Sequence, residues 1–182
     1  MKRIAVIGKQ CSGKSTVAKS ILSHYNGEMI KFADPLYRML YVLNQDKNRG
    51  FMQEGADVVK KYFGENIFVQ LFRENVRGYM ASPQPRKPEI IVCDDLRYKV
   101  ELDAARDMGF GLVFVHAMPA KRRERAKKQG LDFIEEHSSE CEVDSLRQYA
   151  DVDIKNNSTL THLFKQIDDH VMPLVTELSD YL

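Results

Sequence analysis

The residues best suited to chemistry lie near the start of the sequence, where residues 8–15 read GKQCSGKS. In the spacing G-x-x-x-x-G-K-S, two glycines let the backbone curl and point successive N–H groups at one anion. We expect Lys14 to face solvent and reach the β- and γ-phosphates of a nucleotide, and the Ser15 hydroxyl to ligate Mg²⁺. The residues expected to bind a nucleoside triphosphate are Gly8, Cys11, Ser12, Gly13, Lys14, Ser15 and Thr16.

The segments that flank this loop are suited to position it. An apolar run at residues 3–7 precedes the loop and is typical of a buried strand. After the loop, Val17, Ala18, Ile21 and Leu22 recur at helical spacing. The start of that helix adds a partial positive charge. A strand, a glycine loop and a helix in this order favour a phosphate-binding site over a chance match in a turn.

Length and composition limit the class of protein. A chain of 182 residues suits one α/β domain, and 43% hydrophobic with 29% charged residues are typical of a globular protein in water. The formal charge of +1 gives no general attraction to nucleic acid or membrane, and no apolar stretch approaches the roughly 20 residues that span a bilayer. The first strand begins almost at Met1, and three cysteines lack metal-ligand spacing. We therefore expect a cytoplasmic protein without a membrane partner.

Short apolar runs and helical patterns alternate along the rest of the chain. The further runs lie at residues 29–32, 89–93, 112–115 and 152–154. Strands that alternate with helices predict a parallel sheet that helices cover on both faces.

Acidic residues follow the third apolar run. A carboxylate at the carboxyl end of a strand beside the loop strand can hold Mg²⁺ or its waters. Asp94 and Asp95 should point to opposite sides, so only one can face the phosphates. Arg97 offers a planar fork for an anionic substrate. The alternative is that these are ordinary charges in a strand-to-helix loop.

The densest charge cluster, KRRERAKK, lies at residues 121–128. Such a run is usually a solvated helix face or a nucleic-acid patch. Phosphoryl transfer, however, needs cations around the transferred group, and a lid can deliver arginines while it excludes water. Arg122 and Arg125 lie about one helical turn apart, and Gly130 could serve as a pivot. We favour a lid at about residues 118–140, and nucleic-acid binding is disfavoured because no aromatic residues interleave with the charges.

Five segments together resemble one family. They are residues 8–16, FADPLY at 32–37, DLRYKVE at 95–101, HSSE at 137–140 and IKNNSTL at 154–160. In this order they resemble the viral and bacterial deoxynucleoside monophosphate kinases and the related animal-type phosphomevalonate kinases, which are P-loop small-molecule kinases. The GTPase motif N-K-x-D is absent from the sequence.

The resemblance implies a nucleoside-monophosphate-kinase-like α/β fold in three layers, as a single domain over residues 1–182. A five-stranded parallel sheet would carry a helical acceptor-binding insert at about 34–80 and the lid. By the same resemblance Arg49 would clamp the acceptor phosphate and Gln53 would touch its base. The remaining acceptor-site residues it implies are Asp34, Arg97 and Glu140.

The function we expect is transfer of the γ-phosphoryl of Mg-ATP to the phosphate of a nucleoside or deoxynucleoside monophosphate. Lys14, Arg122, Arg125 and Asp95 would be the catalytic residues, with Ser15 and Asp95 at the metal. Phosphomevalonate kinase is the first alternative, because residues 139–144 resemble its Ser-Glu-Cys stretch. A nucleotide-binding module without turnover is the second, although a pure binder has little need of lid arginines.

Overall fold

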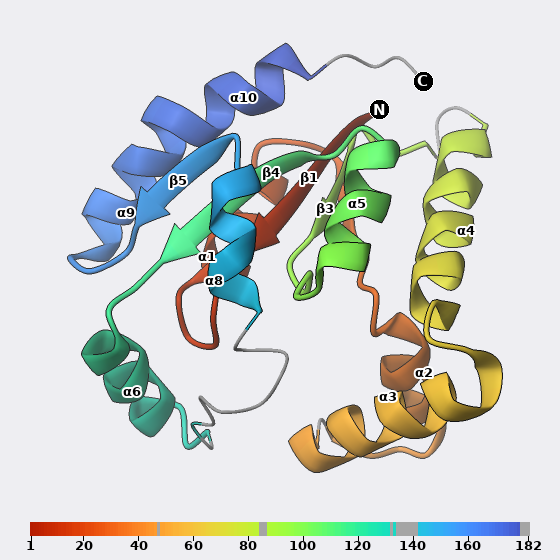
Figure 1. Cartoon of the computed structure of the whole chain (residues 1–182). Helices are drawn as coiled ribbons and strands as arrows, with labels where there is room; N and C mark the ends of the chain where they lie inside the picture. The colour runs from red at the N-terminus through yellow and green to blue at the C-terminus, as the bar shows by residue number, and fades with distance from the viewer. Residues whose placement is uncertain (47, 84–86, 132, 134–141, 179–182) are drawn as a thin grey trace.

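Five parallel strands form one sheet in the order β2-β3-β1-β4-β5 (Figure 1). The computed structural model describes residues 1–46, 48–83, 87–131, 133 and 142–178. The strands are β1 Lys2–Ile7, β2 Gly27–Met29, β3 Ile90–Cys93, β4 Gly111–His116 and β5 Val152–Lys155. The expected five-stranded parallel sheet is therefore confirmed.

The centre of the sheet is apolar on both faces. β1 pairs with β3 on one side, where Lys2 lies opposite Ile90, and with β4 on the other, where Ile4 lies opposite Gly111. β1 is therefore the central strand: β2 and β3 lie on one side of it, and β4 and β5 lie on the other. Ligands of such sheets bind where the strand order reverses, beyond the carboxyl ends of the strands, and here that place lies beyond β1.

Helices cover both faces of the sheet. One face packs against α1 Lys14–Leu22, α9 Leu160–Gln166, the π-helical η2 Ile167–Val171 and α10 Met172–Glu177. The other face packs against α4 Ile67–Ala81, α5 Lys99–Asp107 and α8 Val143–Leu146, which a 3₁₀ turn, η1 Arg147–Tyr149, connects to β5. The π-helical η2 lies directly before α10, whose first turn contains Pro173, and this is consistent with the missing N–H of proline.

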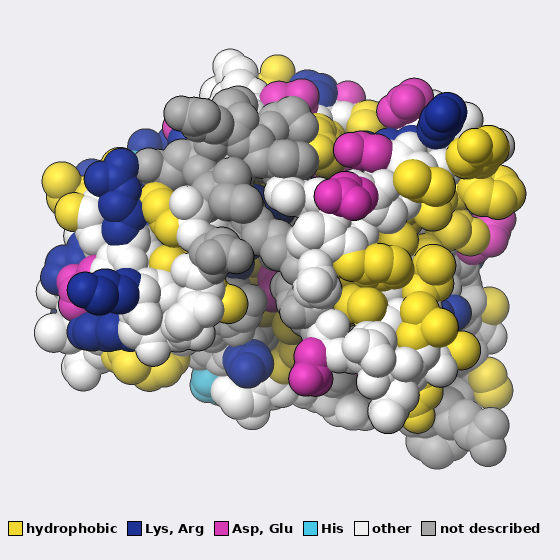
Figure 2. Space-filling view, turned by 90° about the horizontal axis from the view of Figure 1, so that it is seen from below, with side chains coloured by type: hydrophobic (Ala, Val, Ile, Leu, Met, Phe, Trp, Pro, Cys, Tyr) yellow, Lys and Arg dark blue, Asp and Glu magenta, His cyan; other side chains and the backbone are white. Residues whose placement is uncertain are grey.

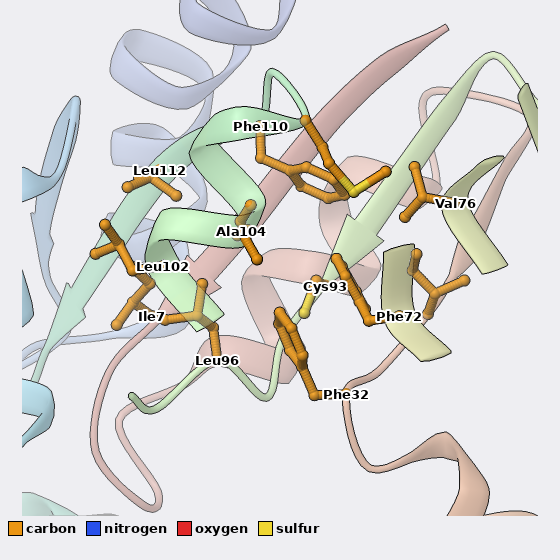
Figure 3. Close-up of a cluster of buried hydrophobic side chains, with 14 of the residues drawn as sticks. Ile7, Phe32, Phe72, Val76, Cys93, Leu96, Leu102, Ala104, Phe110 and Leu112 are labelled. Atoms are coloured by element: carbon orange, nitrogen blue, oxygen red, sulfur yellow. The ribbon is translucent and has the colours of Figure 1, made fainter. Parts of the chain in front are cut away.

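The second strand ends earlier than its apolar run predicts. We expected a strand at residues 29–32, but β2 ends at Met29. Ile30 still donates its N–H to Val92 O (2.9 Å), and the chain then turns, with Phe32 buried against Phe72 at a ring-centroid distance of 3.9 Å. Figure 3 shows this pair in the core beneath α5. The apolar run thus continues into a buried turn, and periodicity alone does not separate the two.

The region at 34–80 is helical, as expected. It contains α2 Asp34–Val42, α3 Arg49–Phe63 and most of α4. α2 and α3 stand away from the sheet, whereas α4 packs against it through Phe72 and Val76 (Figure 1). On the opposite side, α6 Pro119–Lys128 carries the basic cluster. The two groups of helices therefore lie on either side of the carboxyl end of the sheet.

Candidate nucleotide-binding site

The loop between β1 and α1 has room only for glycine at two positions. Gly8 has φ +154°, and a Cβ there would lie 2.4 Å from Val115 O. Gly13 has φ +111°, and a Cβ there would lie 2.3 Å from Asn156 Nδ2. Both distances are shorter than real contacts, so a side chain at either position would displace the loop. Cys11 also has a positive φ, 59°, which costs about 1–2 kcal/mol for a residue with a Cβ.

Two side chains of the loop are buried inside it. Lys14 is 8% exposed, and its Nζ donates a hydrogen bond to Lys9 O (2.9 Å). The expectation that this lysine faces solvent is therefore wrong, because the curled loop encloses it. Ser12 is 1% exposed, and its Oγ has no hydrogen-bond partner among the described residues. A buried hydroxyl without a partner is uncommon, and a phosphate oxygen in the loop would be a suitable acceptor.

Asp94, at the end of β3, faces the first turn of α1. Its Oδ2 accepts a hydrogen bond from Ser15 Oγ (2.7 Å), and its Oδ1 forms an ion pair with Lys31 Nζ. Burial by itself would raise the pKa of Asp94, but the Lys31 ammonium and the two hydrogen bonds hold it below its usual value. Burial likewise opposes the charge of Lys31, yet Asp94 raises the pKa of this lysine. The pair is therefore ionised at neutral pH.

Asp95 faces the other way, as strand alternation predicts. Its two carboxylate oxygens accept hydrogen bonds from the backbone N–H groups of Phe32 and Ala33, both at 3.0 Å. The carboxylate thus fixes the turn that leads into α2. The structure therefore brings Ser15 together with Asp94, whereas the sequence had suggested Asp95 as its partner at the metal.

Arg125, on α6, holds the backbone of the loop. Its Nη1 donates to Cys11 O (3.2 Å) and to Ser12 O (3.3 Å), and its Nη2 donates to Asn156 O (2.8 Å) and Oδ1 (3.0 Å). The buried Asn156 donates from Nδ2 to Ser12 O (2.8 Å). Two distant segments thus bind the carbonyls of the loop and hold its backbone in place.

Arg122 lies one turn earlier on α6 and is 3% exposed. Its guanidinium lies over the Phe133 ring, 5.3 Å from the centroid. Together with Lys9 and Ser12 it lines a cavity of about 80 Å³ beside the loop. Both expected lid arginines therefore lie close to the phosphate-binding loop.

Three of the expected acceptor residues lie on the side of the site opposite α6 (Figure 1). Asp34 is the first residue of α2, its Oδ2 accepts a hydrogen bond from Lys31 N (3.0 Å), and burial raises its pKa. Arg97 lies in the connection between β3 and α5, and Gln53 is half-buried on α3. The Arg49 side chain lies outside the part of the chain that the structure describes.

Glu140 also lies outside the described residues.

The two sides of the site differ in character, as Figure 2 shows. Lysines and arginines gather over α6, whereas hydrophobic side chains gather over α2 and α3. The exposed apolar residues of these two helices include Met39, Tyr41, Val42, Val58, Tyr62 and Phe63.

Comparison with known proteins gives the family. A family model described as AAA domain matches residues 4–159, which is most of the chain. The chain belongs to this family. The match includes the loop at 8–15 and both aspartates after β3. No curated protein matches the AAA-domain chain at a significant level.

Solved structures share the fold of this AAA-domain chain. A gluconokinase from Sinorhizobium meliloti 1021 is 17% identical with a TM-score of 0.60, and the match covers 97% of this chain and 95% of that one. A shikimate kinase from Aquifex aeolicus VF5 is 17% identical with a TM-score of 0.58, over 94% and 97%. A shikimate kinase from Acinetobacter baumannii in complex with shikimate is 11% identical with a TM-score of 0.54, over 98% and 96%. The chain therefore has the P-loop kinase fold of these proteins.

The donor atoms around the loop suit one metal in particular. Ser15 and Asp94 supply a hydroxyl and a carboxylate, which are oxygen ligands of the kind that Mg²⁺ prefers. Within the described part of the chain, no group of three or more His, Cys, Asp or Glu residues could hold a metal ion. A site with few protein ligands fits Mg²⁺, because this ion is usually bound by one or two carboxylates together with substrate phosphates. No described helix is long and apolar enough to cross a membrane.

Glu101 gives the protein a predicted pH dependence. Burial raises the pKa of this carboxyl to about 7, although it accepts hydrogen bonds from Arg97 N (2.7 Å) and Tyr98 N (3.1 Å). Between pH 4.5 and about 7 the folded protein therefore holds a proton that the unfolded chain has lost, so stability falls as pH rises through this window. The loss should be about 3 kcal/mol.

Glu101→Gln removes this titration. We expect its free energy of unfolding, relative to that of the wild type, to increase between about pH 5 and about pH 8. Urea denaturation of both proteins at the two pH values measures the difference. Equal differences at both pH values would show that Glu101 does not carry the dependence.

Proposed function

We propose that this protein is a kinase that transfers the γ-phosphoryl of Mg-ATP to the phosphate of a nucleoside or deoxynucleoside monophosphate. The observation that carries the donor half is the buried Ser12 hydroxyl in the loop, which has no partner among the described residues, together with the Ser15–Asp94 pair at the start of α1. The structural neighbours, which are a gluconokinase and shikimate kinases, support phosphoryl transfer as the reaction.

On the donor side, N–H groups of the loop and the Lys14 ammonium would bind the phosphates. Ser15 and Asp94 would hold Mg²⁺, which neutralises charge on the phosphates when it is bound. Arg125 and Asn156 would act through the loop, because their donors are already committed to its carbonyls. Arg122 is the better candidate for a cation that approaches the transferred group, since it lines the cavity beside the loop.

The acceptor phosphate needs no strong general base, because it is already ionised. Holding its oxygen in line with the γ-phosphorus, while cations neutralise the spreading charge, supplies most of the catalysis. Asp34 and Arg97 would therefore orient the acceptor rather than remove a proton.

The acceptor half of the proposal rests on two segments that the fold brings together. Residues 32–37 and 95–101 carry the resemblance to deoxynucleoside monophosphate kinases. The two segments are in contact, because Asp95 accepts hydrogen bonds from Phe32 N and Ala33 N. The turn before α2 and the loop after β3 therefore form one wall, across the end of β3 from the phosphate-binding loop. This arrangement supports an acceptor bound between that loop and α2.

A hydroxyl acceptor is the second candidate. It is favoured by the structural neighbours, which are a gluconokinase and two shikimate kinases. The two candidates separate in one assay, in which ADP release from Mg-ATP is measured with a panel of nucleoside and deoxynucleoside monophosphates, phosphomevalonate, gluconate and shikimate. We expect release above the acceptor-free rate with a monophosphate. Release only with gluconate or shikimate would favour the second candidate.

Arg49→Ala tests the acceptor side. Arg49 is the first residue of α3, which Asn48 caps by accepting a hydrogen bond from Phe51 N (3.0 Å). A guanidinium at this place can grip a phosphate through two parallel hydrogen bonds that alanine cannot replace. We expect the Michaelis constant for the acceptor to rise about 10–100-fold while that for ATP stays nearly unchanged.

Separate titration of ATP and acceptor against the Arg49→Ala variant measures this split. Arg77→Ala, at an exposed position on α4, is the matched control. Weaker ATP binding with an unchanged Michaelis constant for the acceptor would show that Arg49 does not bind the acceptor. It would also contradict the assignment of residues 34–80 as the acceptor-binding region.

A further inference from the structure

Lys31 has a buried anionic partner and a position between the two halves of the site. Its Nζ pairs with Asp94 Oδ1, while Ser15 donates to Oδ2 of the same carboxylate. The Asp94 side chain is 4% exposed, whereas that of Lys31 is 25% exposed. The ammonium therefore approaches the carboxylate from the open side of the site.

The backbone of Lys31 belongs to the acceptor side. Its N–H donates to Asp34 Oδ2 (3.0 Å), which fixes the start of α2, and its ammonium lies 5.8 Å from the centre of the Tyr37 ring. The side chain thus extends from the turn before α2 toward the first turn of α1. A phosphate group passing from the loop to an acceptor at α2 would move across this gap.

The Lys31 ammonium and a bound Mg²⁺ would compete for the carboxylate of Asp94. A metal held by Ser15 and Asp94 would place two further positive charges next to the Lys31 ammonium, because both cations would contact the same carboxylate. Like charges that share one buried carboxylate repel each other strongly. Lys31 is long and flexible enough to leave, since its side chain is 25% exposed. The nearest new source of negative charge would be the phosphates.

We propose that Lys31 is a phosphate-binding residue whose ammonium rests on Asp94 in the nucleotide-free protein and moves to the terminal phosphate of a bound Mg-triphosphate. This inference rests on the proposed function, because it takes the donor to be a triphosphate in the loop. It assigns to Lys31 the binding of the group that is transferred. The competing interpretation is a permanent counter-ion that only neutralises Asp94.

Binding of a fluorescent, non-hydrolysable ATP analogue and of ADP separates these interpretations without turnover. For Lys31→Met in excess Mg²⁺, we expect the dissociation constant of the analogue to rise about 10–100-fold, as for the loss of one charged hydrogen bond. The constant for ADP, which lacks the terminal phosphate, should change less than about threefold. Lys165→Met, at an exposed position on α9, should change neither constant.

Equal effects on ADP and the analogue, or no effect on either, would overturn the inference and leave the proposed function standing. An analogue that does not bind the wild type would overturn both. Lys31→Met also leaves Asp94 unpaired, so crystal structures of the wild type with and without the Mg-analogue provide a second test. We expect Lys31 Nζ within about 3.2 Å of a terminal phosphate oxygen in the complex. Lys31 still paired with Asp94, with no phosphate oxygen in reach, would contradict the inference.

Discussion

Lys14→Ala should lower phosphoryl transfer by about 10²–10³-fold, which is the usual cost of one preorganised charge contact. The lysine is 8% exposed, and its ammonium donates to Lys9 O within the loop. Alanine would remove the one side-chain cation that the motif places against the phosphates. The measurement is the turnover rate at saturating Mg-ATP and acceptor.

The buried position of Lys14 requires a check on folding. Thermal unfolding of the variant should remain cooperative, because Lys9 O still accepts a hydrogen bond from Ser12 N (3.2 Å) when the lysine is removed. Lys19→Ala, on the exposed face of the same helix, is the matched control and should keep full activity. Near-normal turnover from a folded Lys14→Ala protein would show that the loop is not part of the catalytic site.

Asp94→Asn should also lower turnover by about 10²–10³-fold and raise the Mg²⁺ concentration needed for half-maximal rate. The variant loses the charge that faces Ser15 and leaves the Lys31 ammonium without its carboxylate. Asp95→Asn is the matched control, because its carboxylate faces the backbone N–H groups of Phe32 and Ala33. An amide accepts only one of these bonds well, so stability should fall by about 1–3 kcal/mol.

Magnesium titrations of turnover and thermal unfolding of both variants compare the two aspartates. A raised Mg²⁺ requirement in Asp95→Asn alone would restore the assignment that the sequence suggested. The same requirement in the wild type and Asp94→Asn would place the metal elsewhere.

Much of the fold follows from local sequence patterns. The buried strand at β1 and the helix after it have clear periodicities, and the loop between them has a spacing that few other structures need. The alternation of strands and helices is enough to predict a covered parallel sheet. The end of β2 was not predictable, because the apolar Ile30 and Phe32 continue the strand pattern into a turn.

The site was less predictable than the fold, because its contacts join distant segments. Strand alternation places Asp94 and Asp95 on opposite sides, but it does not tell which one faces α1. That depends on how β3 pairs with β1, which is long-range information. Lys31 and Asn156 were missed for the same reason, since their partners lie 63 and 144 residues away along the chain.

Arg125 shows a related limit. Helical spacing with Arg122 predicts a shared face of α6. The fold gives the two guanidinium groups different surroundings: Arg125 binds the carbonyls of Cys11 and Ser12, whereas Arg122 lies over Phe133. The density of charge in the sequence indicated that this helix lies at the site, but it did not predict that its two arginines make different contacts.

The most direct test of the account is the chemical identity of the product. The protein is incubated with Mg-ATP and the monophosphate that gives the fastest ADP release, and phosphorus NMR then follows the transferred group. We predict coupled resonances of a new nucleoside diphosphate, formed in proportion to ADP and lost in Lys14→Ala. A new phosphate monoester, or inorganic phosphate alone in proportion to ADP, would contradict transfer to a phosphate acceptor.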